Sequence, residues 1–178
     1  RALLQAIRQE RVSVERVARD PKRAARNLDR YLGKSLGDEA PADAAEGGFS
    51  AQRGRLPWPT PGRLEATFGT KVDPASNVVL VQKGLSLRAP FGANVRSVFS
   101  GRVVFSASKE GYGRLVVIDH GGGYSLYAHL ERALVRRGDT VNQQQVIGLV
   151  GDSGSTKGTY LYFELRLGRE PVDPLKWL

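Results

Sequence analysis

The side chains with the clearest capacity for chemistry lie in one short stretch near the end of the sequence, residues 160–166. Strict alternation of apolar and polar residues predicts a strand with two different faces. One face is apolar and consists of Leu161, Phe163 and Leu165. The other carries two phenols, a carboxylate and a guanidinium, from Tyr160, Tyr162, Glu164 and Arg166. We expect the first face to be buried in a core and the second to present its polar groups in front of the sheet.

Metal chemistry has few candidate ligands in this chain. The sequence contains no Cys and only two histidines, His120 and His129. A hydrolytic zinc site normally combines two or three histidine or carboxylate ligands with a general base. The lack of Cys also excludes disulfides and thiolate metal sites. The sequence therefore offers few of the ligands that zinc-dependent hydrolysis needs.

Charge and composition narrow the possible partners. The chain has 178 residues, 40% of them hydrophobic, which is enough for one domain with an appendage. A net charge of +9 indicates an anionic partner, such as nucleic acid, a membrane surface or the cell wall. No nucleic-acid-binding motif is present, and the aromatic residues are not interleaved with Lys and Arg. We therefore expect no nucleic-acid partner. No apolar run approaches the roughly 18 residues of a membrane-spanning helix.

Residues 1–55 are predicted to form two helices and a linker. The chain begins at Arg1 without a signal-peptide pattern, which suggests a fragment of a longer protein. Residues 1–19 have helical periodicity, and Asp20-Pro21 restarts the pattern. A second apolar stripe, on residues 22–32, is formed by Ala24, Ala25, Leu28, Tyr31 and Leu32. So short a helix must dock, either on a neighbouring helix or over a groove of the following domain. Residues 34–55 lack periodicity and are predicted to be a flexible linker.

Residues 56–178 are predicted to form a mainly β domain. Short alternating segments are separated by Gly, Asp and Asn turns, and no helical period of useful length occurs. Consecutive hairpins of this kind are typical of antiparallel meanders. The expected strands are 63–68, 78–87, 93–99, 102–107, 114–119, 124–129, 145–150 and 160–167.

The order of motifs in this region closely resembles the LytM (lysostaphin-type) peptidoglycan peptidase domain. The resemblance covers about 120 residues and is carried by segments 91–95, 100–104, 111–113, 117–121, 127–130, 137–141, 147–154 and 171–174. It implies an antiparallel β domain with a substrate groove. Members of that family are zinc endopeptidases that cleave cross-links of the bacterial cell wall.

At the metal positions this sequence departs from the family pattern. The resemblance places the zinc ligands at Gln82, Ser86 and Tyr162, and a further catalytic histidine at Tyr160. Of the family's site histidines, only His129 is retained. Neutral amide, hydroxyl and phenol groups are poor zinc ligands, so we expect neither metal nor cofactor and no catalysis. His120, at a hairpin end, is expected to be structural.

A degenerate LytM domain preceded by helices resembles the EnvC-type murein hydrolase activators. That resemblance implies a periplasmic protein that switches on N-acetylmuramoyl-L-alanine amidases during cell division. It also implies a coiled coil, largely outside this sequence, that engages a membrane ABC-type division complex. Residues 1–33 would comprise the end of that coil and an autoinhibitory helix at 22–32, acting through Ala25, Leu28, Tyr31 and Leu32.

The vacated groove is the predicted amidase-binding site. Tyrosine and arginine dominate binding hot spots, and an amphipathic helix in a groove is a common recognition mode. Alternation is expected to place Tyr127 and His129 on one face, with Lys83 and Arg166 at the rim. The predicted groove residues are Lys83, Ser86, Tyr112, Leu115, Tyr127, His129, Tyr160, Tyr162 and Arg166. The alternative is a non-catalytic module that uses the basic surface and the groove to bind peptidoglycan directly.

Overall fold

The fold is taken from a computed structural model, in which residues 26, 30, 48–72 and 79–178 are described. The chain divides into two compact units, Arg1–Gly37 and Asp38–Leu178. In the first unit Arg26 and Arg30 are helical and exposed. Residues 1–19 and the apolar stripe of Ala25, Leu28, Tyr31 and Leu32 lie outside the described residues.

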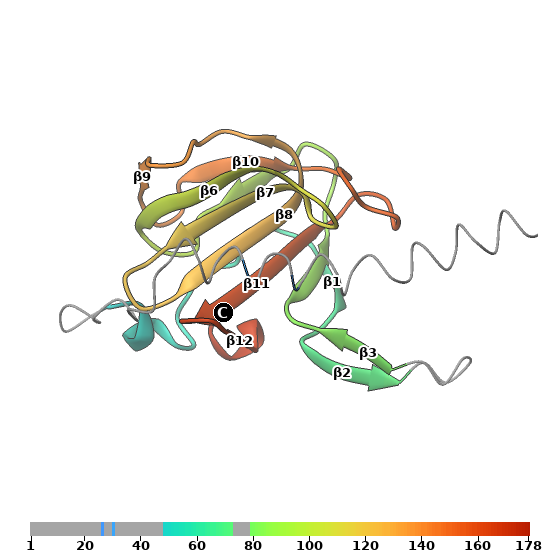
Figure 1. The fold of residues 1–178 in the computed structure, drawn as a ribbon, viewed down its shortest axis with the longest axis horizontal. Helices are drawn as coiled ribbons and strands as arrows, with labels where there is room; N and C mark the ends of the chain where they lie inside the picture. The colour runs from blue at the N-terminus through green and yellow to red at the C-terminus, as the bar shows by residue number, and fades with distance from the viewer. Residues whose placement is uncertain (1–25, 27–29, 31–47, 73–78) are drawn as a thin grey trace, which may run out of the picture. The chain divides into compact units, whose positions relative to one another are not determined.

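The second unit is an antiparallel β domain, which confirms the expected fold class (Figure 1). Its large sheet has the strand order β1-β4-β11-β8-β7-β6-β9, with β10 paired to β5 and β8, and β12 paired to β11. Strands β2 and β3 form a separate two-stranded sheet. The strands are β1 (Arg63–Ala66), β2 (Gly69–Val72), β3 (Val79–Gln82), β4 (Leu85–Arg88), β5 (Asn94–Arg96), β6 (Gly101–Lys109), β7 (Gly113–Asp119), β8 (Tyr124–Ala133), β9 (Thr140–Val141), β10 (Val146–Val150), β11 (Leu161–Leu167) and β12 (Glu170–Val172).

The hydrophobic core lies on one face of the central strands β4, β11, β8 and β7. On β11 it contains Leu161, Phe163 and Leu165, all fully buried, so the predicted apolar face is confirmed. Side chains from β5 and β10 complete it, including Val95, Ile147 and Val150. Because β10 is hydrogen-bonded to both β5 and β8, the sheet folds back over its own apolar face.

The β domain begins before the predicted boundary at residue 56. The 3₁₀ turn η1 (Phe49–Gln52) places Phe49 in the core. The Phe49 ring stacks on His120 and on Trp177, the C-cap residue of the 3₁₀ turn η2 (Pro174–Lys176). The ring centroids are 4.8 Å apart for the His120 pair and 5.1 Å apart for the Trp177 pair. The final part of the predicted linker 34–55 therefore packs on the domain.

The predicted strand 78–87 is two strands, β3 and β4, interrupted at Lys83 and Gly84. Gly84 sits where a Cβ atom would lie 2.3 Å from the carbonyl oxygen of Phe163. Only glycine permits this close approach of β4 to β11. The interruption releases β3 from the large sheet, and β3 pairs instead with β2, a strand that the sequence did not predict.

A left-handed residue in β8 changes which face its side chains occupy. His129 has φ = 61°, and the pairing of β7 with β8 shifts register between Arg114 and Val116. Beyond this bulge β8 pairs with β10. A bulge adds one residue to a strand and so reverses the alternation of faces. Tyr127 consequently lies opposite Phe163 in the core, and the expectation that it shares a face with His129 is wrong.

Candidate functional site

The polar face of β11 is the candidate site, and we call it the tyrosine face. It is formed on β11 and on the neighbouring strands and loops by Ser86, Tyr112, Leu115, His129, Tyr160, Tyr162, Glu164 and Arg166. Tyr112 reaches it from the turn before β7, and its ring meets that of Tyr162 edge to face with centroids 5.9 Å apart. The structure thus brings together most of the residues that the sequence assigned to one groove.

The three positions that the sequence predicted to correspond to the family's zinc ligands converge. Ser86 lies directly opposite Tyr162 in the pairing of β4 with β11. Gln82 Nε2 donates a hydrogen bond to Ser86 Oγ at 3.1 Å. The donors offered here are an amide, an alcohol and a phenol, which do not fit zinc. In the described part of the chain, no group of three or more His, Cys, Asp or Glu residues is arranged to hold a metal ion.

His129 is held as a neutral imidazole of one tautomer. Its Nδ1 lies 2.9 Å from the carbonyl oxygen of Ser153, which can only accept, so Nδ1 carries the proton. Nε2 then accepts from the Tyr160 hydroxyl at 2.8 Å. Burial lowers the pKa of His129 and raises that of Tyr160. Both ring nitrogens are engaged, which makes the pair a fixed structural element of the face.

A buried ionic network occupies the other end of the tyrosine face. Glu164 accepts from Arg166 Nε at 2.5 Å and from the Tyr162 hydroxyl at 2.7 Å. Glu164 is fully buried and Arg166 is 1% exposed. Burial raises the pKa of Glu164, while Arg166, Tyr162 and the nearby charge of Lys83 favour its ionised form. Burial also raises the pKa of Tyr162, which therefore remains a donor.

The exposure of the predicted groove residues differs from the expectation. Lys83 and Tyr162 are half-buried, whereas the other seven are at most 9% exposed. Arg166, expected at the rim, is instead enclosed beside Glu164. Tyr127 is fully buried in the core, where its hydroxyl accepts from the Val98 amide at 3.0 Å. Tyr127 therefore does not belong to the tyrosine face, and Arg166 is not a freely presented side chain.

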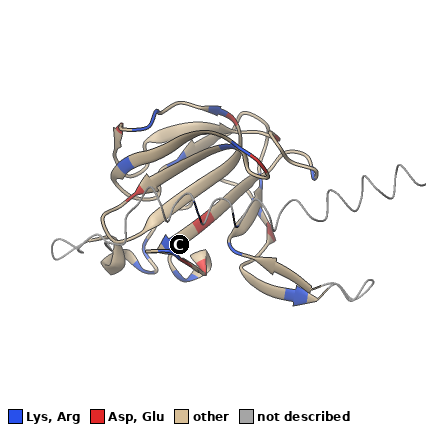
Figure 2. Cartoon of the chain, viewed as in Figure 1, with Lys and Arg blue, Asp and Glu red and all other residues tan. Residues whose placement is uncertain are grey.

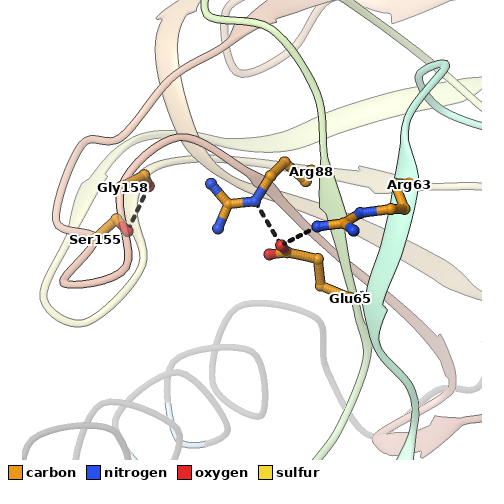
Figure 3. A network of polar contacts seen from close by, with 5 residues as sticks. All are labelled: Arg63, Glu65, Arg88, Ser155 and Gly158. Atoms are coloured by element: carbon orange, nitrogen blue, oxygen red, sulfur yellow. Dashed lines mark hydrogen bonds and ion pairs between the residues drawn. The ribbon is translucent and has the colours of Figure 1, made fainter.

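Sequence reasoning missed a polar cluster of Arg63, Glu65 and Arg88 on strands β1 and β4 (Figure 3). Glu65 accepts from Arg88 Nε at 2.5 Å and from Arg63 at 3.3 Å. The hydrogen bond from Arg88 lowers the pKa of Glu65, and the charge of Glu65 helps to raise the pKa of Tyr160. Arg63 and Glu65 share a strand face and could have been paired from the sequence. Arg88 joins them only because β1 pairs with β4.

His120 has the structural role expected of it. Its Nδ1 donates to the Ser100 carbonyl at 2.8 Å, so Nε2 accepts from Ser125 Oγ at 2.7 Å. The ring is 8% exposed and stacks on Phe49. Burial lowers its pKa to about 4, so it is neutral at physiological pH.

Comparison with known proteins identifies the domain. The model of peptidase family M23 matches residues 80–174, which include β4, β8, β11 and the converging positions described above. The chain belongs to peptidase family M23. The match spans more than half of the chain and confirms the resemblance to LytM domains.

Relatives of this M23 chain include activators and peptidases. The murein hydrolase activator EnvC of Escherichia coli is 38% identical over 133 residues, which are 74% of this chain and 31% of EnvC. The DD-carboxypeptidase/endopeptidase Mpg of Neisseria meningitidis is 35% identical over 64% of this chain and 26% of its own length. A zinc-containing peptidase from Vibrio cholerae superposes with a TM-score of 0.62 at 29% identity, covering 67% of this chain and 38% of that one.

The M23 chain thus spans about a third or less of the two curated relatives. Among its described residues, none of the helices has the length and apolar character needed to cross a membrane.

Proposed function

We propose that this M23 domain activates periplasmic N-acetylmuramoyl-L-alanine amidases and does not itself cleave peptidoglycan. The observation that carries the proposal is the convergence of Gln82, Ser86 and Tyr162, the residues predicted to occupy the positions of the family's metal ligands. Without a zinc ion, no bound water is acidified for attack on a peptide bond. The relative named as a murein hydrolase activator, EnvC, supports the activating role.

The tyrosine face is the proposed amidase-binding surface. Tyr112 and Tyr162 supply rings of the kind found at binding hot spots, and Lys83 supplies a cationic group beside them. The His129–Tyr160 pair and the Glu164–Arg166 network hold the floor of this surface in one arrangement. A rigid floor favours binding because less conformational freedom is lost when the partner docks.

Autoinhibition by the helix predicted at 22–32 is the second part of the proposal. Apart from Tyr127, which lies in the core, six of the eight predicted groove residues are at most 9% exposed, so a partner could reach them only after they become more exposed. The apolar stripe of Ala25, Leu28, Tyr31 and Leu32 is suited to a groove of this kind. In a longer protein, the preceding coiled coil would connect the helix to a membrane ABC-type division complex.

A dye-release assay tests the activating role. Labelled peptidoglycan is incubated with a purified amidase and either the compact unit 38–178 or the full chain. We expect release to rise with residues 38–178 and to rise less with the full chain. Neither protein should release dye in the absence of amidase. If neither stimulates the amidase, the activating role is wrong, and zinc bound in stoichiometric amount would favour a peptidase instead.

Direct binding to peptidoglycan is the second candidate function, and the net charge of +9 favours it. Co-sedimentation with purified sacculi distinguishes the two functions when combined with the dye-release assay. A binding module would sediment strongly and leave the amidase unchanged. An activator would stimulate the amidase whether or not it sediments.

Tyr162→Ala tests whether the tyrosine face is the binding surface. We expect the variant to weaken amidase binding by about 1–3 kcal/mol, the range of a hot-spot residue. Tyr162→Phe is the matched control, because it keeps the ring and removes only the hydroxyl donated to Glu164. Arg166→Ala is a poor probe, since it would also deprive the buried Glu164 of its ion-pair partner. Unchanged affinity in Tyr162→Ala would place the binding surface elsewhere.

A further inference from the structure

The two-stranded ribbon formed by β2 and β3 carries an unusual amount of exposed apolar surface. Val72, Val79, Leu80 and Val81 are each 50–63% exposed. The ribbon pairs with no strand of the large sheet and extends away from it beside β1 (Figure 1). A two-stranded sheet is only marginally stable by itself in water. Exposed apolar residues on such an element indicate an interaction surface.

The register of the ribbon separates these residues into two faces. Thr70 pairs with Val81 and Val72 pairs with Val79, so these four share one face. Lys71 pairs with Leu80, and Gly69 pairs with Gln82, so Lys71, Leu80 and Gln82 share the other. We call these the valine face and the leucine face. The leucine face combines one apolar side chain with one cation.

The leucine face continues directly from the tyrosine face. Gln82, at the end of β3, donates its side-chain hydrogen bond to Ser86, which lies opposite Tyr162. Leu80 is the next residue on the same side of β3, about 7 Å along the strand from Gln82. Lys71 lies across the ribbon from Leu80. A partner seated on Tyr162 therefore meets Gln82, Leu80 and Lys71 in succession if it extends past the edge of the sheet.

We propose that the leucine face is the outer part of the amidase-binding site and contacts an amphipathic helix of the amidase. This inference rests on the proposed function. Leu80 takes an apolar side chain of the helix, and Lys71 takes an acidic one. The charge is complementary to an acidic partner because the two strands contain Lys71 and no Asp or Glu (Figure 2). The valine face points to the opposite side and remains outside the contact.

Contact with the leucine face sets a minimum length for the amidase helix. Reaching from Gln82 to Leu80 takes about 7 Å, which corresponds to roughly five helical residues at about 1.5 Å each. The helix therefore has to extend more than one turn beyond the tyrosine face. An apolar residue followed within that extension by Asp or Glu would match Leu80 and Lys71 in order.

Two matched pairs of variants in the full chain test the inference with a purified N-acetylmuramoyl-L-alanine amidase. Leu80→Ser and Val81→Ser change adjacent residues of similar exposure, 56% and 63%, on opposite faces. Lys71→Glu and Thr70→Glu introduce the same acid on opposite faces. We expect Leu80→Ser and Lys71→Glu to weaken amidase binding about tenfold each. The control variants Val81→Ser and Thr70→Glu should change it less than about twofold. Thermal unfolding should be similar within each pair.

The outcomes separate this inference from the proposed function. If neither the unaltered chain nor residues 38–178 bind or stimulate the amidase, the proposed function fails and the inference fails with it. If the unaltered chain binds but Leu80→Ser leaves the affinity unchanged, only the inference is overturned. If Val81→Ser and Thr70→Glu weaken binding as much as Leu80→Ser and Lys71→Glu do, both faces of the ribbon affect binding equally. The contact through the leucine face is then also overturned.

Discussion

Most side chains on both faces of the central strands are buried, but the two faces are built from different chemistry. The core face of β11 presents Leu161, Phe163 and Leu165, whereas the tyrosine face presents a carboxylate, a guanidinium and two phenols. Burying an ion pair is often no more stabilising than apolar residues of similar volume, because both charges lose their hydration. Stability alone therefore does not account for the tyrosine face. The two faces therefore differ in what holds them together, with an ion pair and hydrogen bonds on the tyrosine face and apolar packing on the core face.

The largest effect that would test this comparison is expected at Glu164. Glu164→Ala should lower the free energy of unfolding by about 3–5 kcal/mol, because the charge of Arg166 stays buried after its carboxylate partner is removed. Replacing both residues, with Glu164→Leu and Arg166→Met, should have little effect or be stabilising. Urea unfolding of the full chain measures both. If the double variant is as unstable as the single one, the ion pair supports the fold in the same way as the core face does.

A pH-dependent effect is expected on the core side, at His120. Its folded-state pKa of about 4 is below the unfolded value of about 6.5, so the unfolded chain binds a proton first as the pH falls. The titration of His120 leaves the free energy of unfolding unchanged above about pH 6.5. Between pH 6.5 and 4 it lowers that free energy by about 3 kcal/mol.

Urea unfolding across this pH range measures the effect. His120→Gln should show a weaker dependence, and carboxyl groups that titrate in both proteins cancel in the difference. Parallel pH profiles for the two proteins would contradict the assignment of the effect to His120.

A smaller effect is expected from Tyr127, whose phenol lies on the core face. Tyr127→Phe removes the acceptor for the buried Val98 amide and should destabilise the fold by about 1–3 kcal/mol. The ring contact with Phe163, whose centroid is 5.4 Å away, should remain. Amide hydrogen exchange at Val98 should accelerate in parallel. A loss of amidase binding without a loss of stability would instead return Tyr127 to the partner surface.

The smallest of these effects is expected at the retained histidine. Tyr160→Phe removes the hydroxyl that donates to His129 Nε2 and should cost about 0.5–1.5 kcal/mol. The Nδ1 proton should stay in place because the Ser153 carbonyl still accepts it. Nitrogen chemical shifts of the imidazole report the tautomer. A tautomer change in the variant would mean that Tyr160, and not Ser153, sets the state of His129.

The sequence predicted most strands near their observed positions, because alternation is a local property that survives into the folded state. The strand prediction was wrong where a single residue interrupts the regular alternation of the backbone. Gly84 ended a predicted strand and released β3, since the carbonyl of Phe163 leaves no room for a side chain there. Phe49 was assigned to a linker because its partners His120 and Trp177 are distant in sequence.

The sequence by itself determined the fold class and the apolar face of β11, and it predicted neutral residues at the metal positions. These follow from alternation and from the identity of single residues, and neither depends on distant contacts. Tertiary structure alone decided that Tyr127 faces the core, because the left-handed His129 shifts the phase of β8. It also decided that Arg166 is enclosed beside Glu164, because burial depends on every element packed around a side chain.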